Sequence, residues 1–116
     1  MKLRIIKVGE LIKQEVGRII LEGVNFPEKV LVTVIKAKVS VDLRYADVFV
    51  SVFPSGKAVE EEVEKILNEN VYDIQQELNK ELSMRPVPKI RFRIDTSGQY
   101  VEKISKLIKK SGLKNK

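Results

Sequence analysis

Residues 83–95 constrain the fold of this chain more than any other stretch, because two prolines there are followed by a strict alternation. Pro86 and Pro88 lack a backbone N–H and clash with a preceding helical turn, so a helix must end near Leu82. After the prolines, apolar and basic residues alternate with the period of a strand. Its apolar side is formed by Ile90, Phe92 and Ile94, and its basic side by Lys89, Arg91 and Arg93. The sequence therefore predicts a strand with one buried face and one basic face.

The length and composition predict a single globular domain. The chain has 116 residues, of which 43% are hydrophobic and 33% charged, enough to bury a core without crosslinks. We expect this domain to span residues 1–112, followed by a short basic tail over 113–116. Cysteine and histidine are both missing from the sequence. Disulfides, thiolate zinc sites and the most usual general base are therefore excluded. We expect no cofactor, no metal and no enzymatic activity.

Charge near the N-terminus and the lack of long apolar runs bear on localisation. No apolar run approaches the roughly 20 residues that a membrane helix needs. The first ten residues are interrupted by Lys2, Arg4, Lys7 and Glu10, so they do not resemble a signal peptide. We therefore predict a cytoplasmic, monomeric protein with no membrane partner and no small-molecule substrate.

The formal net charge of +6 is unevenly distributed. Residues 57–82 hold eight carboxylates against three lysines, whereas residues 101–116 hold six lysines against one glutamate. An acidic middle with basic flanks indicates a polyanionic partner met on one side of the molecule. A well-solvated surface explains the same charges equally well, so charge alone leaves both interpretations open.

Hydrophobic periodicity predicts the remaining elements. Apolar residues at helical spacing predict a helix over residues 4–21, and β-branched residues predict strands over 30–39 and 45–53. The apolar phase of the first strand changes near Ile35, which predicts a β-bulge there. The short connection over 40–44 makes the two strands antiparallel neighbours.

The apolar stripe over residues 57–82 allows one long helix, but we predict two helices with a kink near Asn70, because Asn68-Glu69-Asn70 is poor helix material. A last amphipathic helix is expected from Val101, ended by Gly112. The predicted fold class is α+β, in the order α-β-β-α-(kink)-α-β-α. Helices would cover one face of a three-stranded mixed sheet. The other face would carry Lys36, Lys38, Lys89, Arg91 and Arg93, interleaved with Phe49 and Phe53.

This order of elements resembles the type II KH domain, an RNA-binding fold. Three blocks make a closer match: Val39 to Ser51, the helix–kink–helix segment, and Arg85 to Asp95. Together they resemble the bacterial ribosome-binding factor A family over nearly the whole chain. In that family an Ala-x-Gly kink joins the two helices, and Asn70-Val71-Tyr72 stands at this place.

The resemblance implies a non-enzymatic assembly factor that binds the free small (30S) ribosomal subunit and 16S rRNA. Such a factor assists late 16S rRNA processing and 30S maturation, especially in the cold. The alternatives are a generic RNA-binding KH-like module, or a protein-interaction module that docks a basic partner through carboxylates between Glu60 and Glu81. An enzyme has little support, because no nucleophile–base pair or metal-ligand set can be assembled from these residues.

The candidate RNA-binding residues are the exposed cations and the kink. Cations in alternate strand positions or on one helix side bind phosphates as point charges or forks. Solubility, strand-edge protection and helix-dipole effects explain such cations about equally well. Phe49, Phe53 and Tyr45 are candidates for base stacking, although packing within the fold explains them better. The predicted binding residues are Lys2, Arg4, Lys7, Lys36, Lys38, Arg44, Asn70, Arg85, Lys89, Arg91, Arg93, Lys103, Lys106, Lys109 and Lys110.

Overall fold

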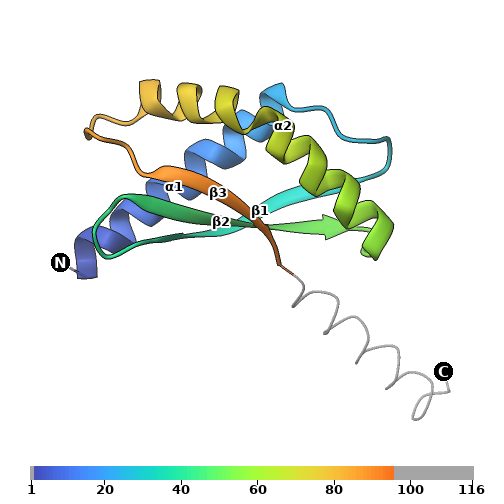
Figure 1. Cartoon of the computed structure of the whole chain (residues 1–116), viewed down its shortest axis with the longest axis horizontal. Helices are drawn as coiled ribbons and strands as arrows, with labels where there is room; N and C mark the ends of the chain where they lie inside the picture. The colour runs from blue at the N-terminus through green and yellow to red at the C-terminus, as the bar shows by residue number, and fades with distance from the viewer. Residues whose placement is uncertain (1, 96–116) are drawn as a thin grey trace, which may run out of the picture.

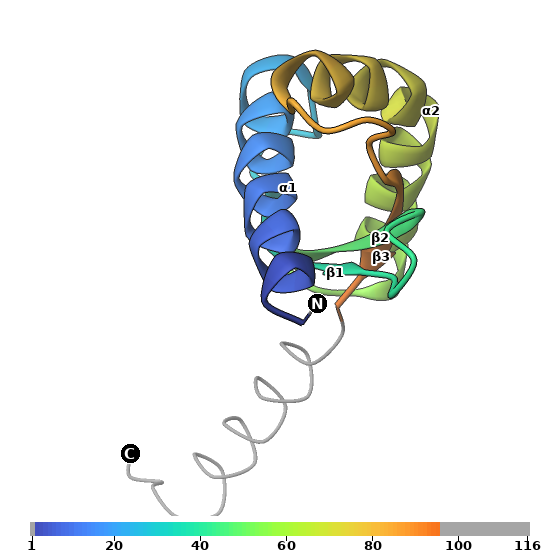
Figure 2. The same cartoon turned by 90° about the vertical axis from the view of Figure 1, so that its left-hand side faces the viewer.

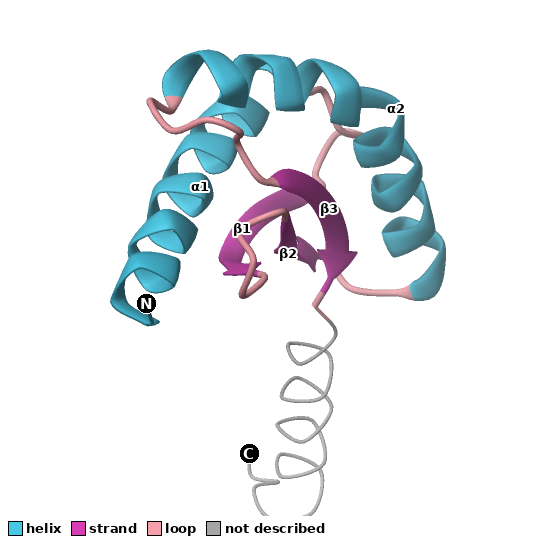
Figure 3. Cartoon of the chain, turned by 60° about the vertical axis from the view of Figure 1, so that its left-hand side comes forward, coloured by secondary structure: helices cyan, strands magenta, loops and turns pink. Residues whose placement is uncertain are grey.

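The periodicities of the sequence become five elements in the computed structural model, which describes residues 2–95. They are α1 (Lys2–Gly23), β1 (Leu31–Val39), β2 (Tyr45–Phe53), α2 (Lys57–Glu81) and β3 (Lys89–Ile94). Both helices lie on one side of the sheet (Figures 1 and 3). We call the opposite side, which no element within residues 2–95 covers, the open face. The fold is therefore α+β, with two described helices and a three-stranded mixed sheet.

The sheet has the strand order β1-β2-β3, so β2 is its central strand. β1 pairs with β2 in the antiparallel sense, as the short connection predicted. β3 pairs with β2 in the parallel sense, and α2 provides the long crossover that parallel strands require. This arrangement places the basic strand β3 at one edge, directly beside the central strand.

The bulge predicted near Ile35 is confirmed. The pairing of β1 with β2 shifts register between Val34, which faces Val50, and Lys36, which faces Phe49. Without the extra residue, strict alternation would carry Lys36 to the helix side together with Val34. The bulge therefore turns the basic half of β1 toward the open face.

The core lies between β2 and the two helices. The even-numbered residues of β2 are buried, and both helices cross that side of the sheet (Figure 2). Apolar residues of α1 and α2 complete the core. Among residues 2–95, side chains with at most 2% of their surface exposed include Ile12, Val16, Ala46, Val48, Val50, Val63, Leu67, Ile74, Leu78 and Pro88. The buried face of β3 adds Ile90 and Phe92, as the alternation predicted.

Gly9 allows α1 to lie directly on β1. A methyl group built on Gly9 would stand 2.7 Å from the backbone oxygen of Ala37, closer than a carbon can approach without displacing that strand. Two turns later Gly17 faces β1 more loosely, with its nearest neighbour, the Cβ of Val34, at 4.0 Å. The helix therefore approaches the strand most closely at its N-terminal half.

The prediction of two separate helices over residues 57–82 is wrong. α2 is one continuous helix of 25 residues, but its axis bends in the middle (Figures 1 and 3). Asn70 lies at the bend, and its side-chain amide donates a hydrogen bond of 2.8 Å to the carbonyl of Ile66. That carbonyl is the acceptor of the regular helical bond from residue 70, so the side chain competes with the helical ladder there. α2 therefore bends near Asn70 but does not end there.

The bend brings the second half of α2 toward the C-terminal end of α1 (Figure 2). Arg18 of α1 makes ion pairs with Glu15 at 3.1 Å and Glu22 at 2.9 Å, and it lies 3.7 Å from Glu81 of α2. These contacts link the two helices above the core. The predicted last helix, the tail over 113–116 and the lysines from Lys103 onward lie outside the described residues.

Candidate nucleic-acid interface

Five cations gather on the open face of the sheet, and each reaches it for a local reason. The alternation of β3 sends Lys89, Arg91 and Arg93 to this side, where all three are exposed. The bulge in β1 sends Lys36 and Lys38 to the same side, and both are exposed. The structure therefore unites the five sheet cations that the sequence predicted.

Strand register arranges these cations in rows across the sheet. Phe49 of β2 faces Lys36 on one side and Arg93 on the other. Two residues earlier in β2, Asp47 faces Lys38 on one side and Arg91 on the other. Each row therefore has a cation at both edge strands and a different kind of residue at its centre.

Asp47 binds both arginines of β3 through the same carboxylate oxygen. Arg91 Nε donates a hydrogen bond of 3.1 Å to Oδ1, and Arg93 Nε lies 3.6 Å from that atom. The side chain of Asp47 is 24% exposed, against 50% for Arg91 and 55% for Arg93. The carboxylate therefore lies below the guanidinium groups, which face solvent above it.

Two aromatic rings of β2, those of Phe49 and Tyr45, each have one of these cations over a ring face. Lys36 Nζ lies 4.9 Å from the centre of the Phe49 ring, and the Arg91 guanidinium lies 4.9 Å from the centre of the Tyr45 ring. Cations over ring faces are favourable contacts within a fold. Phe53 is different, since it is 63% exposed and faces Leu31, itself 62% exposed, across the strand pair.

Arg44 lies at one end of the open face, in the connection between β1 and β2. Its backbone carbonyl accepts a hydrogen bond of 2.8 Å from the N–H of Lys89, so the loop is tied to the start of β3. Its side chain is 76% exposed, and its Nε lies 3.9 Å from a carboxylate oxygen of Asp42. The loop thus presents a sixth cation next to Lys89.

This connection is held rigid by its own side chains. Asp42 accepts hydrogen bonds from the Ser40 hydroxyl at 2.7 Å and from the Arg44 backbone N–H at 3.1 Å. Both bonds favour the ionised carboxylate, the one from Ser40 most, so the pKa of Asp42 falls below its ordinary value. These bonds accompany Leu43 in the left-handed backbone region, with φ of 63°.

The other predicted cations of the described part do not join this face. Arg4 and Lys7 are exposed on α1. This helix belongs to the helix layer, and its N-terminal end lies near the β1–β2 turn (Figure 1). Arg85 turns back on its own loop, where Nη1 donates to the carbonyls of Leu82 and Met84, both at 2.6 Å. The side chain of Lys2 lies outside the described part of the chain.

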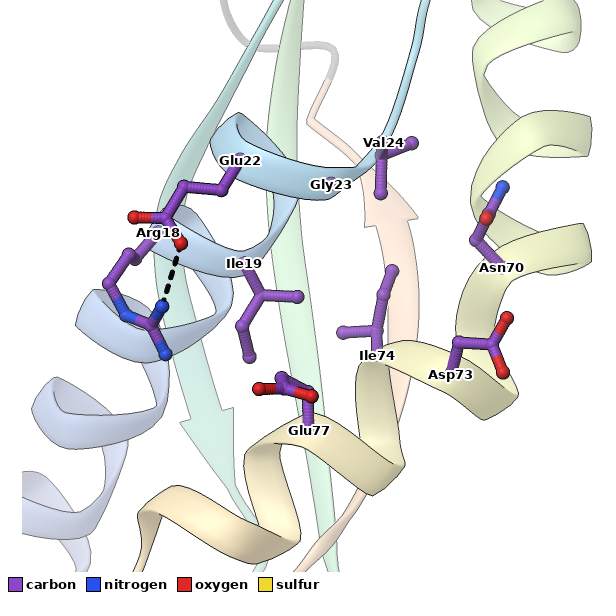
Figure 4. A pocket seen from close by; sticks show the side chains of 9 residues that line it. All are labelled: Arg18, Ile19, Glu22, Gly23, Val24, Asn70, Asp73, Ile74 and Glu77. Atoms are coloured by element: carbon purple, nitrogen blue, oxygen red, sulfur yellow. Dashed lines mark hydrogen bonds and ion pairs between the residues drawn. The ribbon is translucent and has the colours of Figure 1, made fainter.

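Asn70 lies in different surroundings from the basic sheet face. It lines a cavity of about 270 Å³ between α1 and the bend of α2 (Figure 4). The charged groups around it are Arg18 and three carboxylates, Glu22, Asp73 and Glu77. This predominance of negative charge disfavours a phosphate there.

The sequence analysis missed the role of Asp47. Alternation along β2 puts Asp47 on the same face as Phe49, but only the parallel register with β3 shows that it stands opposite Arg91. Across residues 2–95 no cluster of carboxylates could hold a metal ion, and no helix there is long and apolar enough to cross a membrane.

Comparisons with known proteins agree with this architecture. Residues 4–108 match the family model described as Ribosome-binding factor A. A ribosome-binding factor A of Caldanaerobacter subterraneus subsp. tengcongensis is 34% identical over 110 residues, covering 94% of this chain and 89% of the relative.

Solved structures share the fold. The crystal structure of ribosome-binding factor A from Thermus thermophilus superposes with a TM-score of 0.62 at 22% identity, covering 76% of this chain and 92% of that one. A model of the Thermus thermophilus protein, fitted into a cryo-EM map of a 30S–RbfA complex, gives a TM-score of 0.62 at 18% identity, covering 76% and 91%. The matches to the family model and to the curated relative span nearly the whole sequence, so this chain belongs to the ribosome-binding factor A family.

Proposed function

We propose that this protein is a non-enzymatic assembly factor that binds the free 30S ribosomal subunit and contacts 16S rRNA through the open face of its sheet. The observation that carries this proposal is the gathering of five cations on one side of a molecule whose carboxylates are concentrated on α2. Its family membership and the 30S complex of its Thermus thermophilus relative support the same partner.

The chemistry of the open face fits a phosphate backbone. Arginine forks bind phosphate oxygens in pairs, lysines act as mobile point charges, and both release counterions on binding. Bases are not needed for such contacts, which suits the occupied ring faces of Phe49 and Tyr45. Binding one arrangement of 16S rRNA more tightly than its competitors would favour late 30S maturation by mass action, including in the cold.

The predicted residues fall into a central set and a peripheral set. The central set is Lys36, Lys38, Lys89, Arg91 and Arg93, and Arg44 extends it at the loop. Arg4 and Lys7 belong to the periphery on α1. Lys2, the four lysines from Lys103 to Lys110 and a helix following β3 remain predictions.

Co-sedimentation with purified ribosomal particles tests the proposal. The protein is mixed with free 30S subunits, 50S subunits and assembled ribosomes at low and moderate salt. We expect selective retention on free 30S subunits that persists at moderate salt. Equal binding to all three particles, lost as salt rises, would mean a general affinity for polyanions and would refute the proposed specificity.

A charge-matched pair of triple variants tests the site. Replacing Lys89, Arg91 and Arg93 by glutamine removes three cations from the open face, and the salt slope of RNA binding should fall by about 2. The control replaces Lys57, Lys65 and Lys80 of α2 by glutamine, which makes the same change in net charge on the helix layer. Equal loss of 30S binding in both variants would show that net charge, and not the sheet face, determines binding.

A further inference from the structure

Asp47 supplies the only carboxylate within the three strands, at the centre of the basic open face. An anion at the middle of a phosphate-binding surface lowers the attraction of that surface for any polyanion. A surface selected only for positive charge would not place it there.

The contacts of Asp47 leave the binding ends of the arginines unoccupied. A guanidinium carries five N–H donors, one on Nε and four on the two Nη atoms. Both arginines use Nε toward Asp47, and within residues 2–95 their Nη groups have no hydrogen-bond partner. The Nη groups therefore remain available above the sheet.

Arg91 is fixed from two sides. The Asp47 carboxylate holds its Nε at 3.1 Å, and the Tyr45 ring lies 4.9 Å from its guanidinium carbon. Arg93 shares the same carboxylate oxygen two residues along the strand. Side chains ordered before binding lose less conformational entropy when a ligand arrives.

We propose that Asp47 is a positioning residue that makes the open face selective for RNA phosphates arranged to meet Arg91 and Arg93. It holds both arginines by Nε, directs their Nη groups outward, and with its own charge weakens binding to phosphates presented in other arrangements. This inference rests on the proposed function, since it assumes that the open face binds RNA.

A purely structural role is the alternative explanation. An acidic residue opposite arginines on a neighbouring strand stabilises the pairing and offsets repulsion between like charges. In that case, substitution of Asp47 would lower stability but would leave the preference among RNA ligands unchanged. The two roles therefore differ in selectivity.

The test compares Asp47→Asn with the matched control Asp73→Asn. Both variants remove one negative charge, and Asp73 is exposed on α2, away from the sheet face. Each protein is titrated with a short oligouridylate and with free 30S subunits over a range of salt concentrations. Stability is followed by urea unfolding, so that a folding defect is recognised.

For Asp47→Asn we expect affinity for the oligouridylate to rise about threefold, with a salt slope steeper by about 0.7, because one repelling charge is gone. We expect affinity for 30S subunits to fall about fivefold or more, because two arginines lose their fixed orientation. Asp73→Asn should change neither affinity by more than about twofold. Equal increases for both ligands in Asp47→Asn, or no change in their ratio, would overturn the proposal.

The Nε–H signals of the arginines give a second, independent measurement. In ¹⁵N NMR spectra, the Nε–H group of Arg91 should exchange slowly with solvent in the free protein and in its complex with oligouridylate. The Nε–H group of Arg18, which donates to Glu15 on α1, serves as an internal reference. In Asp47→Asn the Arg91 Nε–H should lose most of this protection, because a neutral amide oxygen is a weaker acceptor for a guanidinium than a carboxylate is. Loss of protection in the wild-type protein when RNA binds would show that phosphate displaces Asp47, and would refute its positioning role. The NMR measurement tests the positioning role even if the wild-type protein shows no preference for 30S subunits. Such a lack of preference would refute only the proposed function.

Discussion

Two glycines of α1 provide a test of how this helix is seated on the sheet. The substitutions Gly9→Ala and Gly17→Ala are chemically identical and lie on one helix, eight residues apart. Each exchanges glycine for the best helix former, which stabilises a helix interior by about 1 kcal/mol. Because this gain is the same at both positions, the difference between the two variants reports their tertiary surroundings.

The surroundings differ in a way that fixes the sign of that difference. At Gly17 the new methyl group would have its nearest neighbour at 4.0 Å, an ordinary contact, so the helix gain should be kept. At Gly9 the methyl group would meet the Ala37 backbone oxygen at 2.7 Å, and either α1 or β1 must move. Overpacking of this kind costs about 1–3 kcal/mol. Gly9→Ala should therefore be less stable than Gly17→Ala by that amount.

Thermal and urea unfolding measure the effect. A difference of 1 kcal/mol corresponds to roughly 4–8 °C in Tm for a domain of this size. We expect Gly17→Ala to melt above the wild-type protein and Gly9→Ala to melt well below Gly17→Ala. The m-values should agree among the three proteins, because the surface exposed on unfolding is unchanged. Equal stabilisation by both alanines would refute the close approach of α1 to β1.

Three further predictions concern other contacts. Gln75→Leu should lower stability by about 1–3 kcal/mol in urea unfolding, because the Gln75 amide accepts from the Ile90 N–H at 2.8 Å and donates to the Pro88 carbonyl at 3.1 Å; an unchanged midpoint would contradict this. Asn70→Ala should slow hydrogen exchange at the bend of α2, and unchanged exchange would show that packing alone bends the helix. The pKa of Asp42 in the folded protein lies below its ordinary 3.8, so its contribution to stability is present above pH 3.8 and is lost as the pH falls through the lowered value. NMR titration of this carboxyl group should show a pKa under 3.8. The Asp42→Asn variant should lose this part of the pH dependence of stability.

Local physical chemistry made most of the described fold predictable from sequence. The two prolines and the alternation after them predicted β3. The change of apolar phase in β1 predicted the bulge, because a strand with a side-chain period of two can bury apolar residues of both phases only if it contains an extra residue. The same alternation predicted which cations share the open face. These inferences succeeded because they depend on neighbours along the chain.

The continuity of the helix over residues 57–82 could not be predicted from neighbours along the chain. The helix-breaking tendency of Asn70 and its neighbours predicted a break, but burial of Val63 and Leu67 before the bend and of Ile74 and Leu78 after it keeps the helix continuous. Tertiary packing therefore overrides the local preference, and only the bend remains of it.

In the candidate site, too, some features follow from the sequence alone and others depend on the tertiary structure. The sequence by itself determined that the chain carries a basic strand and a basic half-strand, because side-chain direction in a strand follows from position alone. Only the tertiary structure decided that Asp47 meets Arg91 and Arg93, and that Arg85 binds its own loop. Such contacts depend on the register between strands and on the path of loops, which distant parts of the chain set together.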